Sequence, residues 1–203
     1  RSAEAVRRRK NIRPERETGR RKSAAPARTT RQRKGKKRRP VNEAKPGSRK
    51  DKGETGMIRA MKNEDYDRVY ALWMSVKGFA MRSIDDSREG VARFLARNPR
   101  SSVVAEEDGQ IVGAILCGHD GRRGCLYHVC VSAEYRRRGI GTAMVVFAME
   151  ALKKEKISKV SLIAFTQNDI GNAFWNKIGW TRREDLNYYD FVLNRENIIA
   201  FNR

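Results

Sequence analysis

The sequence from Met57 onward predicts an α+β protein, α/β in the broad sense, with a mixed, mostly antiparallel sheet flanked by helices. Two apolar runs meet at Asp108-Gly109, a dipeptide typical of tight hairpin turns, which predicts antiparallel strands. Further along, strand-like runs alternate with helical ones, which predicts parallel pairing across a helix. The predicted order is β-α-α-β-β-β-α-β-α-β, so hairpins and crossovers share one mixed sheet.

The first part of this region predicts one strand and two helices. Residues 58–61 form the strand, and Asn63 is suited to cap the helix that follows. Four apolar side chains at helical spacing predict its buried face: Val69, Leu72, Trp73 and Val76. Ser87 is suited to cap a second helix, which we expect to end at Asn98-Pro99.

The second part predicts the rest of the sheet. Apolar runs predict strands over residues 102–106, 111–117, 126–131 and 159–165. A long helix is predicted over residues 139–154, with an apolar stripe formed by Ile140, Ala143, Met144, Phe147, Ala151 and Leu152. A shorter helix over 170–178 ends at Gly179 as its C-cap. From Trp180 the sequence predicts one or two closing strands that end near Leu193.

Positive charge is concentrated at the start of the chain. The formal net charge is +21, and residues 1–57 hold 22 Lys/Arg against 6 Asp/Glu. Residues 1–56 contain almost no large apolar side chains, so we predict a disordered basic tail there and a single domain over 57–203. The tail fits a nonspecific RNA or DNA contact, and it equally fits a solubilising segment or one that does not belong to the native protein.

The remaining composition predicts a cytoplasmic protein without a metal. The three cysteines make no Cys-x-x-Cys pair, which argues against a disulfide framework and fits a reducing compartment. With two histidines besides, we expect no structural zinc site. No apolar run approaches the ~20 residues of a membrane span, and no secretory signal is visible, so no membrane contact is expected.

The strongest local feature is a strand, a tight turn and two glycines that open the long helix. Backbone N–H groups and the helix dipole attract an anion at such a helix start. Gly139 and Gly141 would let a pyrophosphate approach the backbone, and Arg136, Arg137 and Arg138 add positive charge. The spacing matches neither Gly-x-x-x-x-Gly-Lys-Ser/Thr nor Gly-x-Gly-x-x-Gly. Taken alone, the motif also fits a glycine turn under a basic surface patch.

In these residues the sequence resembles the GNAT superfamily of acetyl-CoA-dependent N-acetyltransferases. The coenzyme A signature of that family, Gln/Arg-x-x-Gly-x-Gly/Ala at the start of the main helix, is matched by residues 136–141. A second signature, an Asn followed seven residues later by an aromatic residue and then by x-x-x-Gly-Phe, is matched by Asn168, Trp175 and Gly179-Trp180. The two motifs stand in the family's order, and the resemblance covers about residues 57–193.

The resemblance implies the GNAT fold, acetyl-CoA as cosubstrate and no metal. It implies a cofactor site made of Arg136, Arg137, Arg138, Gly139, Ile140, Gly141, Thr142, Val129, Val131, Asn168 and Trp175. The backbone of the loop would bind the pyrophosphate, and Val129 and Val131 would pair with the pantetheine arm as an added strand does. The N–H of Val129 could also polarise the thioester carbonyl.

Trp175 departs from the family, which most often has Tyr at this position as the candidate acid for the departing thiolate. The indole N–H is a donor but no practical acid at neutral pH. Trp175 therefore either hydrogen-bonds or packs against the sulfur, or it only packs the short helix. Tyr188 and Tyr189 are weaker substitutes for the missing phenol.

For the general base, His128 is attractive because it precedes the cofactor turn on its strand. Tyr127, a further catalytic candidate, is expected to face the opposite side of the sheet. His119 and Asp120 lie in a glycine-rich loop that could border the acceptor. The group Asp85, Asp86 and Glu89 fits either an acidic wall for a cationic amine or helix-cap chemistry.

These observations predict an N-acetyltransferase in which an amine attacks acetyl-CoA directly. Two alternatives stay open: a protein or ribosomal N-terminal acetyltransferase, and a non-catalytic acetyl-CoA-binding module with a nucleic-acid-binding tail. The acceptor is an amine on a small molecule, a protein N-terminus or a lysine, and a homodimer is compatible with the sequence.

Overall fold

A computed structural model describes residues 56–202 of the chain. The predicted basic tail lies outside the described residues except for Gly56, so the tail and its boundary stay predictions. The described elements are β1 (Met57–Ala60), η1 (Asn63–Asp65), α1 (Tyr66–Ser75), β2 (Ala80–Arg82), α2 (Arg88–Arg97), β3 (Val103–Glu107), β4 (Gln110–His119), β5 (Gly124–Val131), η2 (Ala133–Tyr135), α3 (Ile140–Lys154), β6 (Val160–Leu162), α4 (Asp169–Lys177) and β7 (Ile199–Phe201).

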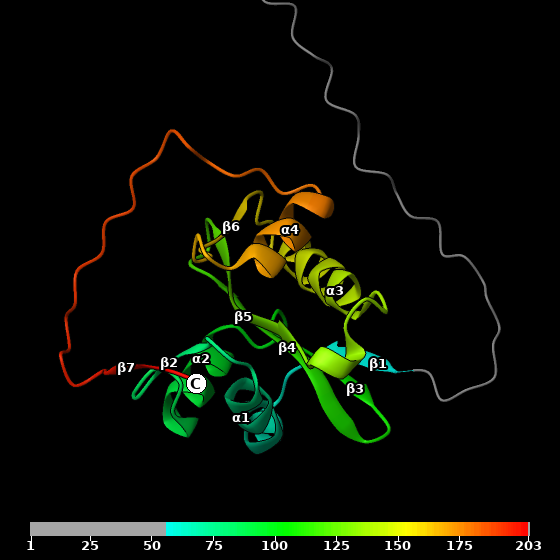
Figure 1. Ribbon diagram of the computed structural model, residues 1–203. Coiled ribbons are helices and arrows are strands. Elements are labelled where there is room, and N and C mark those ends of the chain that lie inside the picture. Colours follow the sequence, from blue (N-terminus) through cyan, green and yellow to red (C-terminus); the bar gives the residue numbers. More distant parts are fainter. Residues whose placement is uncertain (1–55, 203) are drawn as a thin grey trace, which may run out of the picture. The chain divides into compact units, whose positions relative to one another are not determined.

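The main sheet has five strands in the order β1-β3-β4-β5-β6. Three neighbouring pairs are antiparallel, and β5 and β6 are parallel across the α3 crossover. Helices α1 and α2 lie against one face of this sheet, and α3 and α4 lie against the other (Figure 1). The predicted fold class, a mixed and mostly antiparallel sheet flanked by helices, is confirmed.

Local turn and cap signals are confirmed at two places. Asp108 and Gly109 both have positive φ, 51° and 72°, as a tight two-residue hairpin turn between β3 and β4 requires. Ser87 caps α2 because its hydroxyl accepts the N–H of Gly90 at 3.0 Å. The cap predicted at Asn63 is wrong. Lys62 precedes the 3-10 turn η1, and its backbone N–H donates to the Asp65 carboxylate at 2.9 Å.

Apolar packing fills both faces of the sheet. One cluster joins α1 and α2 to the sheet through buried residues such as Val69, Trp73, Val91 and Leu116. The other joins α3 to the opposite face, and the buried residues of α3 are Ile140, Met144, Val145, Ala148 and Leu152. The buried face of α3 is therefore rotated slightly from the apolar stripe predicted for this helix. Ala143 of the predicted stripe is exposed, whereas Val145 and Ala148, which were not in it, are buried.

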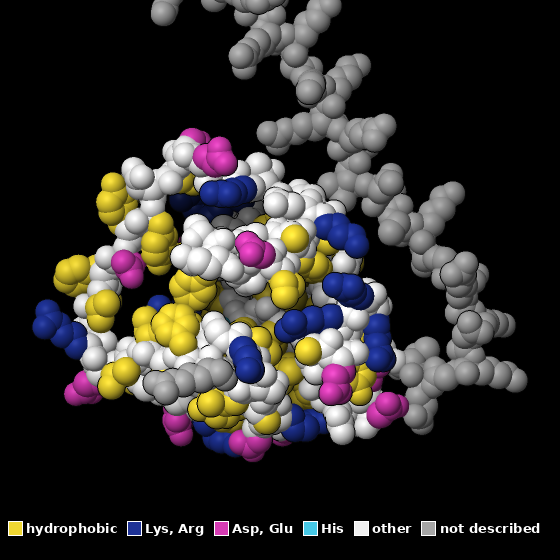
Figure 2. Space-filling view, in the orientation of Figure 1, with side chains coloured by type: hydrophobic (Ala, Val, Ile, Leu, Met, Phe, Trp, Pro, Cys, Tyr) yellow, Lys and Arg dark blue, Asp and Glu magenta, His cyan; other side chains and the backbone are white. Residues whose placement is uncertain are grey.

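The C-terminal region differs from the sequence prediction. No strand forms over the predicted range from Trp180 to Leu193; that segment runs as an exposed arc between α4 and β7, with hydrophobic side chains along it (Figures 1 and 2). These residues favour extended structure, but a strand also needs a hydrogen-bonded neighbour, and within the described residues none pairs with them. The strand that does form is β7, which pairs antiparallel with β2, and neither of these three-residue strands was predicted.

Candidate active site

The start of α3 presents free backbone donors. Gly139 is its N-cap, with a left-handed backbone at φ 86°, and it has no side chain to cap the helix. The N–H groups of Ile140, Gly141 and Thr142 in the first helical turn therefore have no intrahelical acceptor. A Cβ added at Gly139 would meet no atom within 4 Å, so the backbone here is open to a ligand. This arrangement suits a phosphate group.

Two of the three arginines before α3 hold the loop itself. The Arg136 side chain donates to the Val131 carbonyl at 3.0 Å, and Arg138 donates to the Glu134 carbonyl at 3.0 Å and lies over the Tyr135 ring. Within the described residues, no hydrogen bond or ion pair joins the Arg137 side chain to another group, and its φ is +64°. Arg137 is thus the arginine most available to an anion.

Strand β5 has an open edge next to this loop. Its pairing with β6 stops at Leu126, whereas its pairing with β4 continues to Val131. The N–H of Ser132 donates to Val112 on the β4 side, while the Val131 carbonyl accepts from Arg136 on the other side. Because strand residues alternate in direction, the backbone groups of Val129 and Val131 face the open edge. An extended ligand can add there as a strand does.

The start of α3, the open edge of β5 and α4 converge. A Cβ placed on Gly141 would lie 3.4 Å from the Phe174 ring of α4 and 3.7 Å from the Val131 side chain. The structure therefore brings together the end of β5, the start of α3 and the middle of α4.

A β-bulge turns two neighbouring residues of β5 to the same face. The register between β4 and β5 shifts between Ala114 and Leu116, and His128 has a positive φ of 50°. Tyr127 packs edge-to-face on Phe94 of α2, while the His128 ring lies 4.9 Å from that of Trp73 on α1. The expectation that Tyr127 faces the opposite side from His128 is wrong, because the extra residue of the bulge breaks the alternation.

His128 is paired with a buried carboxylate. Its Nε2 lies 2.6 Å from Oδ1 of Asp86, which is 4% exposed. The ring also lies 5.0 Å from the ring of Phe79. Asp86 is 42 residues away in sequence and was not predicted to contact His128; the sequence gives no signal for this pair beyond the position of Asp86 before a helix cap.

The Tyr127 side chain is half-exposed beside this pair. Partial burial, followed by its hydrogen bond with Cys125, raises the pKa of the Tyr127 phenol well above its usual range. The phenol therefore keeps its proton at neutral pH and can donate a hydrogen bond, but it is a weak acid.

Asn168 and Trp175 belong to α4. The Asn168 side chain caps α4 by accepting the N–H of Gly171 at 2.9 Å. The Trp175 ring lies between Phe174 and Trp180, at 4.9 and 5.0 Å, and packs on the α3 face of the sheet. Trp175 and His128 thus pack against different clusters on opposite faces, so the structure does not group the three catalytic candidates as one triad.

His119 and Asp120 are engaged in a local turn. Asp120 accepts the N–H groups of Arg122 and Arg123, and these bonds lower the pKa of its exposed carboxyl. His119 Nδ1 accepts the N–H of Gly121. Tyr188 and Tyr189 lie on the exposed arc after α4.

Burial keeps two cysteines in the thiol form. It raises the pKa of Cys117 and that of Cys130 to about 12, so neither is a nucleophile at neutral pH. Residues 56–202 contain no cluster of three or more His, Cys, Asp or Glu side chains that could hold a metal ion. In the same range, none of the helices has the length and apolar character of a membrane span.

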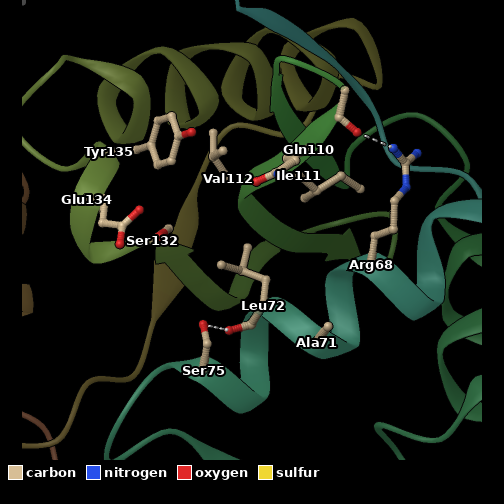
Figure 3. Close-up of a pocket in the computed structure, with 11 residues that line it drawn as sticks. Arg68, Ala71, Leu72, Ser75, Gln110, Ile111, Val112, Ser132, Glu134 and Tyr135 are labelled. Carbon is tan, nitrogen blue, oxygen red and sulfur yellow. Dashed lines mark hydrogen bonds between the residues drawn. The ribbon is translucent and has the colours of Figure 1, made fainter.

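A separate hollow of about 340 Å³ lies between α1, the start of β4 and residues 132–135 (Figure 3). Leu72, Ile111 and Tyr135 line it, and Arg68 at its rim donates to the Gly109 carbonyl. No residue of β5, β6 or α4 lines this hollow, so it is distinct from the open edge.

Proteins similar to this chain in sequence are acetyltransferases. Residues 58–180 match the sequence profile of the acetyltransferase (GNAT) family. Acetyltransferase SG1711 of Sodalis glossinidius is 29% identical over 129 residues, which cover 64% of this chain and 89% of that protein. Acetyltransferase ECA0875 of Pectobacterium atrosepticum is 30% identical over 121 residues, or 60% of this chain and 84% of that one.

Solved structures share the fold at low sequence identity. The PaiA N-acetyltransferase of Thermoplasma acidophilum, in complex with coenzyme A, has a TM-score of 0.56 and 16% identity, and the match covers 71% of this chain and 96% of that one. AAC(6')-Iy, in complex with the bisubstrate analogue CoA-S-monomethyl-acetylneamine, has a TM-score of 0.53 and 15% identity, with 68% and 99% covered.

Proposed function

Because the chain belongs to the acetyltransferase (GNAT) family, we propose that it transfers the acetyl group of acetyl-CoA to an amine by direct attack, with His128 as the general base. The chain is an acyltransferase (EC 2.3.1.-), and acetyl-CoA-dependent acyl transfer is the chemistry of the family.

One observation carries the proposal: the open edge of β5 ends beside the uncapped start of α3. The α3 N–H groups and Arg137 fit a pyrophosphate, and the backbone groups of Val129 and Val131 fit the amide groups of a pantetheine arm. The Val131 carbonyl is held by Arg136, whose exposed side chain can give way to a ligand.

Acetyl-CoA supplies the acetyl thioester. The amine nitrogen forms a C–N bond to the acetyl carbon while the C–S bond breaks, and the sulfur leaves as the coenzyme A thiolate, which takes a proton from solvent. His128 takes the proton that the amine loses, and we propose that the Val129 N–H polarises the carbonyl oxygen. The high thiol pKa values of Cys117 and Cys130 support direct transfer over an acetyl-cysteine route.

Side chains around His128 favour an acceptor with an apolar group near its amine. Tyr127, the residue before His128, is about half-exposed, and the rings of Trp73 and Phe79 lie 4.9 and 5.0 Å from that of His128. The nearby carboxylates are engaged, Asp86 with His128 and Asp85 with the Asn197 amide at 2.7 Å. Because these two carboxylates are already bound, we propose a peptide N-terminus with an apolar residue, or an apolar amine, as the acceptor, since it can pack on aromatic rings.

The proposal is tested by release of free coenzyme A thiol from acetyl-CoA in the presence of an acceptor panel. The panel contains polyamines, aminoglycosides, amino acids and peptides with apolar or acidic N-terminal residues. We expect the largest kcat/KM with the apolar peptides or amines. Preference for polyamines would contradict the acceptor assignment. Tight acetyl-CoA binding without thiol release by any acceptor would favour the non-catalytic binding module.

A further inference from the structure

We propose that Asp86 is a positioning residue, which fixes the His128 ring as the Nε2–H tautomer and presents its Nδ1 lone pair to the acceptor amine. The inference rests on the proposed base role of His128. It adds a second residue to the reaction, and it names the nitrogen atom that takes the proton.

The hydrogen bond between the two side chains sets the tautomer. Asp86 Oδ1 and His128 Nε2 are 2.6 Å apart. An ionised carboxylate only accepts hydrogen bonds, so the proton between them belongs to Nε2. In the neutral ring the other nitrogen, Nδ1, then carries the lone pair.

The second ring nitrogen is accessible. Within residues 56–202, no hydrogen bond engages Nδ1, and it is not among the buried polar atoms that lack a partner. The single such atom in this range is Nε1 of Trp73. The His128 side chain is 19% exposed, so Nδ1 reaches the surface.

Asp86 is itself held in place on three sides. Its Oδ2 accepts the N–H of Arg82 at 2.6 Å, and its backbone carbonyl accepts the hydroxyl of Tyr66 at 2.8 Å. Ser87, the next residue, caps α2. A carboxylate fixed in this way holds the imidazole without moving itself, as the third member of a catalytic triad does.

The His128 backbone is held in an uncommon conformation. A positive φ at a non-glycine residue is strained and persists where the surroundings enforce it. Trp73 and Phe79 enclose the ring, and Asp86 binds its far end. A purely structural pair would hold the same tautomer, because the carboxylate accepts from Nε2 in either case. Only a base would lose its activity when the lone pair leaves the exposed nitrogen.

Substitution Asp86→Asn distinguishes these roles. The Arg82 N–H still needs an acceptor, so the amide oxygen would turn toward it and the amide NH2 would face His128. Nε2 would then become the acceptor, and the proton would move to Nδ1. The exposed nitrogen would lose its lone pair although the packing is kept. Asp85→Asn is the matched control, because it removes the same charge one residue earlier without contact to His128.

The readout is the 15N NMR spectrum of histidine-labelled full-length protein at about pH 9, above the ordinary titration range of imidazole. Only two histidines, His119 and His128, contribute signals. We expect the Nε2–H tautomer for His128 in the unaltered protein and in Asp85→Asn, and the Nδ1–H tautomer in Asp86→Asn. With the best acceptor, kcat should fall about 100-fold or more in Asp86→Asn and stay within about twofold in Asp85→Asn.

An Nδ1–H tautomer in the unaltered protein would overturn the proposal even if Asp86→Asn failed to fold. A changed tautomer with unchanged kcat would overturn the catalytic role of the pair. The NMR measurement needs no turnover, so failure to acetylate any amine would contradict the proposed function separately.

Discussion

At the scale of single residues, Gly139 and Gly141 have different roles at the start of α3. Gly139 has the left-handed backbone that favours glycine, and Gly141 lies in the first helical turn with Phe174 nearby. Space for a Cβ exists at Gly141, at 3.4 Å from the Phe174 ring, but a branched side chain would extend toward the proposed pyrophosphate site.

Gly141→Val is therefore expected to weaken acetyl-CoA binding at least tenfold, a loss of about 1.4 kcal/mol. Gly141→Ala is the matched control. It adds only the tolerated Cβ and should keep both the fold and most of the affinity. Isothermal titration with acetyl-CoA, together with circular dichroism, measures both effects. Equal affinity of a folded Val variant would show that the phosphate loop is misplaced.

Trp175 can be tested by exchange of its ring. Trp175→Phe keeps contact with Phe174 and Trp180 and removes only the indole N–H, so kcat should change by no more than about twofold. Trp175→Tyr introduces a phenol at this position, and we expect a higher kcat. A large loss in the Phe variant with unchanged stability would instead assign the indole N–H a direct role.

At the scale of elements, charged side chains join β1, α1 and β3. Asp65 is buried and binds both Arg59 and Arg68, and these two arginines also bind Glu106. Burial opposes ionisation of Asp65, but hydrogen bonds from Arg59, from the Lys62 N–H and from Arg68 outweigh it and lower its pKa to about 2.

Because the folded-state pKa of Asp65 lies below its ordinary value of 3.8, the carboxylate stabilises the fold above about pH 4, and the contribution is lost as the pH falls toward 2. Asp65→Asn should lower the free energy of unfolding at pH 7 by on the order of 2 kcal/mol and flatten its pH dependence between pH 4 and 2. Asp67→Asn, at an exposed position outside this group, should leave both nearly unchanged. Urea unfolding across this pH range provides the measurement.

Elements with strong local signals were predicted from the sequence, and those that depend on distant partners were not. The turn at Asp108-Gly109 and the Ser87 cap depend on neighbouring residues, so the sequence contains their cause. Strands β2 and β7 are three residues each and form only because they meet across more than a hundred residues. The Asp86–His128 pair also depends on residues far apart in sequence, so the sequence did not predict it. The bulge at His128 was not predicted either, because no glycine marks its position.

Considering the whole domain, the two faces of the main sheet have different roles in the proposed reaction. The α3 and α4 face carries the proposed cofactor loop, while the α1 and α2 face carries His128 and Asp86. The open edge of β5 lies between them, so cofactor and acceptor can approach from opposite sides.

The predicted role of residues 1–56 is tested by a protein that starts at Met57. We expect it to fold and to bind acetyl-CoA with an unchanged dissociation constant, because both apolar clusters and the proposed site lie after this point. If the tail contacts RNA, only the full chain should bind it, with an affinity that falls steeply with salt because counterions are released. A truncated protein that does not fold would contradict the predicted boundary.

The exposed arc between α4 and β7 has a consequence for limited proteolysis. Between Thr181 and Leu193 no backbone hydrogen bond links this segment to the rest of the described chain, and it contains Arg182 and Arg183. Trypsin therefore has accessible cleavage sites there. After cleavage, β7 would stay paired with β2, and Asn202 would still donate to the Trp73 carbonyl at 2.7 Å. The nicked protein would remain a complex of two fragments, separable only under denaturing conditions.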